Sequence, residues 1–229
     1  MDQKDFWTSA EAELRVYDFL SHPFYKAWTA GELSREDIGL YGWQYLHHVS
    51  AFPAYLTALH CRLPYGTTRR TILRNAWEEE ALLISQADLW NQFAQAVKPA
   101  KPPGSGQVLP EIQHLIDTYR EMAQSGPPPM ALGAFYAYES GVHTVAQAKL
   151  TGLKRFYEFG GAACQFLELH TTKAASLQHA QVWRMLIDHA IEKNPDSALE
   201  ALDGVKRGLT VLWNALDGLE AARHSLPKQ

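Results

Sequence analysis

The stretch LGAFYAYESGVHTVAQAKL, residues 132–150, decides the fold class of this chain. It contains no proline, and its apolar residues recur at steps of three and four, which places them on one stripe of an α-helix. Glu139 lies in the middle of that stripe, and His143 follows one helical turn later. Because an unpaired carboxylate in a protein core carries a large desolvation cost, we expect Glu139 to meet a cation, a metal ion or a proton.

The same helical period extends over nearly the whole chain, and no segment alternates with the period of a strand. Helices are expected at about residues 6–20, 23–30, 34–63, 68–97, 110–124, 127–150, 162–192 and 196–224. The third of them begins at Ser34 and Asp37, whose spacing is typical of a capping box. We therefore predict an all-α bundle of about seven or eight helices, folded as a single domain over residues 1–229.

The segment KPAKPPGSGQ, residues 98–107, is the most linker-like part of the chain. It could separate two domains. The segments on either side are equally apolar, however, and neither half looks complete alone. We therefore expect a surface loop at this position.

Composition narrows the class of protein. The chain has 229 residues, of which 46% are hydrophobic and 20% charged, as in ordinary globular proteins. The formal net charge of −4 gives no electrostatic reason to expect binding to nucleic acid or to an anionic membrane. With no membrane-length apolar run and no signal peptide in MDQKDFW, we expect a cytoplasmic protein. Cys61 and Cys164 are far apart and are expected to be buried thiols.

Further polar residues lie on otherwise apolar helical faces. Glu79 and Gln86 share a face of the helix expected at 68–97, and His179 lies on a face of the helix expected at 162–192. His170 precedes His179 by nine residues, so in one regular helix the two rings cannot point into the same site. Carboxylates and histidines that project inward from several helices build di-metal carboxylate sites, which suit iron or manganese. A core-facing histidine is more often structural, so the pattern alone is weak.

Four blocks of sequence resemble the CADD-like proteins of the TenA/THI-4/PqqC superfamily. They are HPFYKAWTAGELSREDIGLYGWQYLHHVSAFPAYLTALH (22–60), RNAWEEE to DLWNQF (74–93), FYAYESGVHTVAQAKLTGL (135–153) and, more loosely, FLELHTTKAASLQHA (166–180). The resemblance implies a haem-oxygenase-like helical fold and a non-haem di-metal oxidase that forms para-aminobenzoate. In that family a tyrosine of the protein itself is the source of the ring, and a lysine is the amino donor.

The resemblance also assigns roles by position. It implies metal-ligand roles for Glu79, Glu139 and His179. Tyr25, in HPFYKAW, matches the sacrificed tyrosine, and Lys149, ten residues after Glu139, matches the lysine that donates nitrogen. Tyr41 and Tyr138 match the neighbouring aromatic residues. The competing interpretations are that Lys149 is a solvated surface residue and that Tyr25 only packs the core.

Parts of the family's ligand pattern are missing. The histidine expected seven residues after the first glutamate is Gln86 in this chain. The last ligand helix should carry H-x-x-x-D-x-x-H, yet the aspartate position is Ser176 if the pattern is aligned on His179 and Ala174 if it is aligned on His170. The aspartate is therefore lost in either alignment.

The ligands that remain suit one metal ion better than two. His143, His170 and Gln86 are additional candidates beside the two glutamates and His179. We therefore expect one iron or manganese ion at an incomplete site and no organic cofactor.

Three functions are compatible with these residues. The first is a CADD-like oxidase that uses its own Tyr25 and Lys149. The second is a metal-free enzyme in the manner of PqqC or TenA, with Glu139 and His179 as acid and base on a small organic substrate. The third is an inactive ligand-binding or interaction protein of the same fold. In each case we expect a small-molecule ligand in the bundle core and, on the resemblance alone, a homodimer that binds neither nucleic acid nor membranes.

Overall fold

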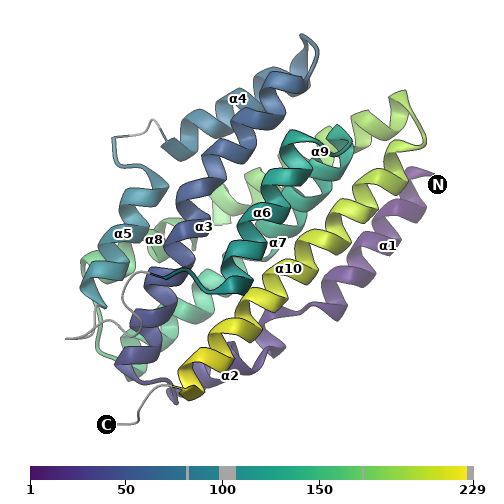
Figure 1. Ribbon diagram of the computed structural model, residues 1–229. Helices are drawn as coiled ribbons and strands as arrows, with labels where there is room; N and C mark the ends of the chain where they lie inside the picture. Colours follow the sequence, from purple (N-terminus) through teal and green to yellow (C-terminus); the bar gives the residue numbers. More distant parts are fainter. Residues whose placement is uncertain (81–82, 98–106, 172, 226–229) are drawn as a thin grey trace.

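The computed structural model describes residues 1–80, 83–97, 107–171 and 173–225, with the side chains of residues 173–179 outside the description (Figure 1). The expected loop at 98–107 lies almost wholly outside the described residues. Within them the chain forms ten α-helices, one short 3-10 helix and no strand, so the all-α prediction is confirmed. The predicted number of helices, seven or eight, was too low.

The helices follow the predicted order, with bounds that differ by a few residues in most cases. They are α1 (Gln3–Val16), η1 (Phe19–Ser21), α2 (Pro23–Ala30), α3 (Arg35–Arg62), α4 (Thr67–Glu80), α5 (Gln86–Ala96), α6 (Pro110–Gln124), α7 (Pro128–Phe156), α8 (Ala162–His170), α9 (Lys173–Lys193) and α10 (Ser197–Ser225). The capping box predicted at Ser34 and Asp37 starts α3, as expected.

Two expected helices are each divided in two. The helix expected at 68–97 is α4 and α5, because Ser85 and Asp88 form a capping box that starts a new helix at Gln86. The helix expected at 162–192 is α8 and α9, which are separated after His170. The two histidines of this region therefore belong to different helices, so the phase argument, which assumed one regular helix, does not apply to them.

The central pair of the bundle is α7 and α10, which lie side by side along most of their length (Figure 1). Two glycines allow this close approach. A side chain on Gly133 would collide with the carbonyl of Ala201, and one on Gly204 would collide with the carbonyl of Met130. α3, α6, α9 and α1 pack around this pair, and α5 and α8 close one side of the bundle (Figure 1).

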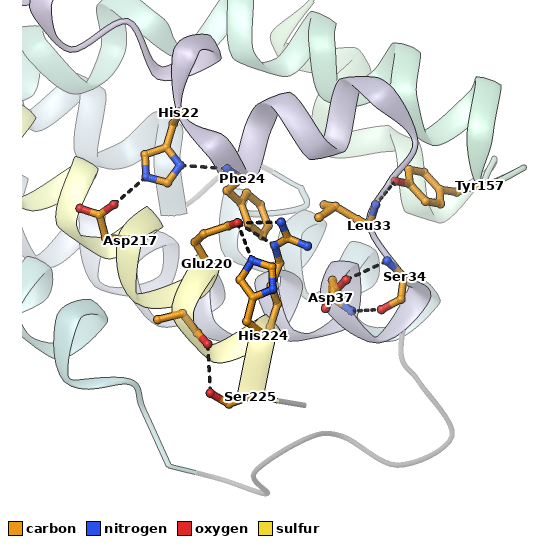
Figure 2. Close-up of polar contacts among 12 residues, drawn as sticks. His22, Phe24, Leu33, Ser34, Asp37, Tyr157, Asp217, Glu220, His224 and Ser225 are labelled. Carbon is orange, nitrogen blue, oxygen red and sulfur yellow. Dashed lines mark hydrogen bonds and ion pairs between the residues drawn. The ribbon is translucent and has the colours of Figure 1, made fainter. Parts of the chain in front are cut away.

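The short helix α2 is fixed in place by polar contacts at its start (Figure 2). His22 is fully buried, and its Nδ1 accepts a hydrogen bond from the backbone N–H of Phe24 at 3.1 Å, so the ring caps the helix. Its other nitrogen, Nε2, must then carry the proton and donates to Asp217 of α10 at 3.0 Å. The ring also packs edge-on against Trp213, with centroids 4.7 Å apart. α2 is thereby attached to α10.

Two further expectations concern the surface. Among the described residues, none of the helices combines the length and the apolar composition that crossing a membrane requires. Both cysteines are free thiols. Cys164 is buried as expected, whereas Cys61 is exposed near the end of α3, so the prediction of two buried thiols was wrong for Cys61.

Candidate active site

Three of the predicted residues meet in the core, although they come from three helices. Lys149 of α7 donates a hydrogen bond from Nζ to the hydroxyl of Tyr41 of α3 at 2.5 Å. The hydroxyl of Tyr41 lies 3.2 Å from that of Tyr25, which α2 supplies. All three side chains are buried. The structure therefore forms a continuous hydrogen-bonded line from the amine to the two phenols.

The amine of Lys149 is surrounded by aromatic rings. Its Nζ lies 4.9 Å from the ring centroid of Tyr41, 5.3 Å from Trp90, 5.5 Å from Tyr25 and 5.7 Å from Tyr45. Ring faces attract the charged amine, but loss of water opposes the charge more strongly. Burial lowers the pKa of Lys149 from 10.5 to about 7. The interpretation of Lys149 as a solvated surface residue was therefore wrong, and near neutral pH much of the amine is an uncharged nucleophile.

The phenols respond to burial in the opposite sense. Desolvation raises the pKa of Tyr25 above its ordinary value of 10, and it does the same for Tyr41, Tyr45 and Tyr138. These hydroxyls stay protonated at any physiological pH, so each one can donate a hydrogen bond. The site consequently combines a weakly basic amine with several neutral donors.

A cavity of about 60 Å³ opens beside this line of residues. We call it the Lys149 chamber. Its wall consists of Phe19, Tyr25, Tyr45, Trp90, Tyr138, Gly141, Val142, Val145, Ala146, Lys149, Phe166, Leu167, Leu212 and Leu216. Tyr45, Trp90 and Phe166 were missed as site residues. The spacing of Tyr45, one turn after Tyr41, was a signal for the first of them; Trp90 and Phe166 are brought in by the tertiary fold.

A second, smaller cavity of about 10 Å³ adjoins the chamber and shares Tyr138, Val142 and Phe166 with it. Besides Tyr138, its polar lining is Glu79, Gln86, Glu139 and His170, and we call these last four residues the donor cluster. Glu79 and Gln86 belong to different helices, not to one face of a single helix as expected, but they still meet here. About 10–15 Å³ holds one water by this measure, so the cavity has room for one ion or water.

His170 is oriented by its own helix. Its ring stacks on Phe166 with centroids 4.3 Å apart, and its Nδ1 lies 2.8 Å from the Phe166 carbonyl. Because a carbonyl only accepts, Nδ1 carries the proton, and the lone pair of the neutral ring is on Nε2. Metal-binding histidines are commonly oriented by such a backbone contact.

The other two predicted histidines, His143 and His179, are not among the four residues that define the donor cluster. His143 is half-buried, does not line the small cavity, and lies with Nδ1 3.1 Å from the carbonyl of His170. It therefore contacts the backbone of His170 and is not among the residues that line the small cavity. The side chain of His179 lies outside the described residues, so its predicted ligand role stays a prediction.

The donor cluster fits one metal ion by its chemistry. Two carboxylates, an imidazole and an amide oxygen are hard ligands of the kind that iron and manganese accept. The buried Oε1 of Gln86 has no hydrogen-bond partner in the described part of the chain. An oxygen that is available to bind a cation would also lack such a partner. Within that same part, no three His, Cys, Asp or Glu side chains are close enough together to form a metal-binding group. The four residues therefore place hard donors around one cavity, but in the described part of the chain they are not close enough together to bind an ion.

A model of the family described as iron-containing redox enzymes matches residues 41–213, which is more than half of the chain. The chain belongs to this family. The 4-aminobenzoate synthase of Nitrosomonas europaea is 30% identical over 230 residues, which cover 96% of this chain and 92% of that protein. The resemblance to CADD-like proteins that the four sequence blocks indicated is thereby confirmed.

Solved structures agree on the fold. A TenA homologue from Pseudomonas syringae superposes with a TM-score of 0.77 at 17% identity, over 95% of this chain and 92% of that one. A CADD-like protein of unknown function from Nostoc punctiforme gives a TM-score of 0.75 at 13% identity, over 98% of this chain and 99% of that one. The expected haem-oxygenase-like fold is confirmed.

Proposed function

We propose that this protein is an iron-dependent oxidase that forms 4-aminobenzoate from its own Tyr25 and Lys149. The observation that carries the proposal is the hydrogen-bonded line from Lys149 through Tyr41 to Tyr25, beside a chamber that adjoins a cavity lined by two glutamates. The 4-aminobenzoate synthase of Nitrosomonas europaea supports the choice of product.

The donor cluster is where the metal would bind. Glu79, Glu139 and His170 would hold an iron ion, with the Oε1 of Gln86 as a further ligand. A bound iron ion would supply the oxidising power of dioxygen, which attack on an unactivated phenol ring requires. The small cavity shares lining residues with the chamber that Tyr25 lines, so the donor cluster and the oxidisable ring of Tyr25 belong to adjoining cavities.

The chain's own residues would perform the remaining tasks. Lys149 would supply nitrogen as a neutral amine, which its lowered pKa of about 7 makes abundant at neutral pH. Tyr41 holds that amine in place and is the group through which a proton can pass between Lys149 and Tyr25. The mostly apolar wall of the chamber would limit the water that could compete for an oxidised ring.

Metal analysis after loading with iron or manganese tests the metal site. The proposal expects about one ion per chain and its loss in Glu79→Ala and Glu139→Ala. The matched control is Glu80→Ala, which removes an exposed carboxylate next to Glu79 and should leave the metal content unchanged. No metal above background under both aerobic and anaerobic loading would overturn the metal-dependent mechanism.

The self-sacrifice is tested by mass spectrometry of the protein after aerobic iron loading. We expect a loss of side-chain mass at Tyr25 and a change at Lys149, accompanied by 4-aminobenzoate in the supernatant. Tyr25→Phe and Lys149→Met should each abolish product in cells that require 4-aminobenzoate for growth. Unchanged growth with Tyr25→Phe would show that the ring comes from another source.

A further inference from the structure

The lining of the Lys149 chamber is of two chemical kinds. Lys149 and the tyrosines Tyr25, Tyr45 and Tyr138 carry polar groups, whereas the rest of the wall, which includes Phe19, Leu212 and Leu216, is aliphatic or aromatic. Lys149 is the one basic side chain among the described residues that line it. A molecule that fits such a space has an anionic head and a compact apolar body.

The amine has hydrogen-bonding capacity left for a ligand. A protonated amine offers three donors, and Tyr41 is the one hydrogen-bond acceptor that the described residues provide to Nζ. The rings around Nζ present faces, which attract its charge but cannot replace an acceptor oxygen. A carboxylate is therefore the head group that would best complete the surroundings of Lys149.

The room in the chamber indicates the size of the ligand body. The chamber's volume of about 60 Å³ is less than half of the roughly 150 Å³ of an apolar cavity that holds benzene, so one small ring would fill the chamber and reach into its opening. The aromatic side chains in the wall favour a ring over an aliphatic chain, because ring edges and faces attract one another.

We propose that the chamber of the unspent protein binds a small aromatic carboxylate of the benzoate class, and that the bound acid blocks the reaction. The carboxylate pairs with Nζ of Lys149, and the ring lies against Phe19, Leu212 and Leu216. A neighbouring anion favours the charged form of the amine, and a charged amine is no longer a nucleophile. The inference rests on the proposed function for the reaction that it blocks. The proposed product is itself an aromatic carboxylate. When product is plentiful it would bind in the chamber and inhibit the single reaction that consumes Tyr25 and Lys149.

Binding is tested on metal-free, intact protein with benzoate and 4-aminobenzoate as probes, and with aniline as the ring that lacks a carboxylate. We expect both acids to bind by calorimetry, and aniline to bind at least about tenfold more weakly. Lys149→Met should weaken binding of the acids by about tenfold or more. Equal binding of aniline and the acids would overturn the proposal.

A second variant pair tests the position of the site without altering Lys149. Gly141 lines the chamber, so Gly141→Leu fills it, whereas Thr144→Leu adds the same side chain to an exposed position of the same helix. We expect the first to weaken benzoate binding by about tenfold or more and the second to leave it unchanged. Unchanged binding in folded Gly141→Leu protein would place the ligand elsewhere and overturn the inference.

The block itself is measured as the fraction of Tyr25 lost after aerobic iron loading, with and without excess benzoate. Benzoate should slow the loss by about tenfold or more at saturation. If benzoate binds and Tyr25 stays intact even without it, the proposed function fails while the ligand site stands. If Tyr25 is lost equally fast in both samples, the proposed function stands and the block is overturned.

Discussion

Nζ of Lys149 and the hydroxyl of Tyr41, from residues 108 positions apart, are joined by a hydrogen bond in the core of the bundle. This hydrogen bond fixes the position of the amine at the end of a long, flexible side chain, because the aliphatic part of Lys149 lies among apolar residues that offer few other acceptors. Trp28 adds a second connection, since its Nε1 donates to the Lys149 backbone carbonyl at 3.1 Å. The amine is thus held beside Tyr25 by contacts from both α2 and α3.

The buried amine should make stability depend on pH. In the unfolded chain Lys149 keeps its proton up to about pH 10.5, whereas in the folded protein it releases it near pH 7. Between these values the unfolded state binds one more proton, so folded stability rises with pH, by at most about 1.4 kcal/mol per unit. Below pH 7 the lysine is at its most destabilising.

We therefore expect Lys149→Met to be more stable than wild type near pH 6–7 and to lose this advantage progressively towards pH 10. The measurement is the free energy of unfolding by urea across that range. Lys154→Met is the control, because Lys154 is solvent-exposed and pairs with Glu168 at the surface. Equal pH slopes for wild type and Lys149→Met would contradict the lowered pKa.

Removing one oxygen should uncouple the amine from the phenol. Tyr41→Phe deletes the acceptor of Nζ and the bridge to Tyr25 while it keeps the ring. We expect a loss of about 1–3 kcal/mol in the free energy of unfolding, the cost of a buried polar group without its partner. We also expect product formation to fall by more than about tenfold. Tyr65→Phe, which changes a hydroxyl on a ring that is 84% exposed, should alter neither quantity.

Local sequence signals predicted most of the helices but not the way in which they divide. The signal S-x-x-D that starts a helix at Ser85 was present in the sequence, but the helical period of apolar residues on both sides of it favoured one long helix.

The burial of Lys149 could not be predicted from its own helix. Ten residues separate Lys149 from Glu139, and at about 100° per residue this places Lys149 about 80° around the helix from the apolar stripe of Glu139. Periodicity alone therefore predicted that the Lys149 side chain faces solvent. Tyr25, Tyr41 and Trp90, which bury it, come from other helices.

The cap of α2 should contribute measurable stability and fix Tyr25. His22→Ala removes both the acceptor for the Phe24 N–H and the bond to Asp217, so we expect a loss of about 1–3 kcal/mol. His22→Asn keeps a good capping group and loses only the second bond, so it should recover part of the loss. Urea unfolding of the two variants provides the measurement. Equal losses would show that the cap itself contributes little.

Gln86 stands where the resemblance to CADD-like proteins predicts a histidine, and that histidine can be introduced. Gln86 lines the small cavity with both glutamates, and an imidazole at this position would add a stronger ligand than an amide oxygen. We expect Gln86→His to slow metal release to a chelator by about tenfold or more, since changes to residues that only support a metal ligand already alter affinity by about 10–100-fold. Gln95→His places the same side chain on an exposed position of α5 and serves as the control. If the two variants release iron at the same rate, Gln86 does not face the metal, and the donor cluster would have to be reduced to the two glutamates and His170.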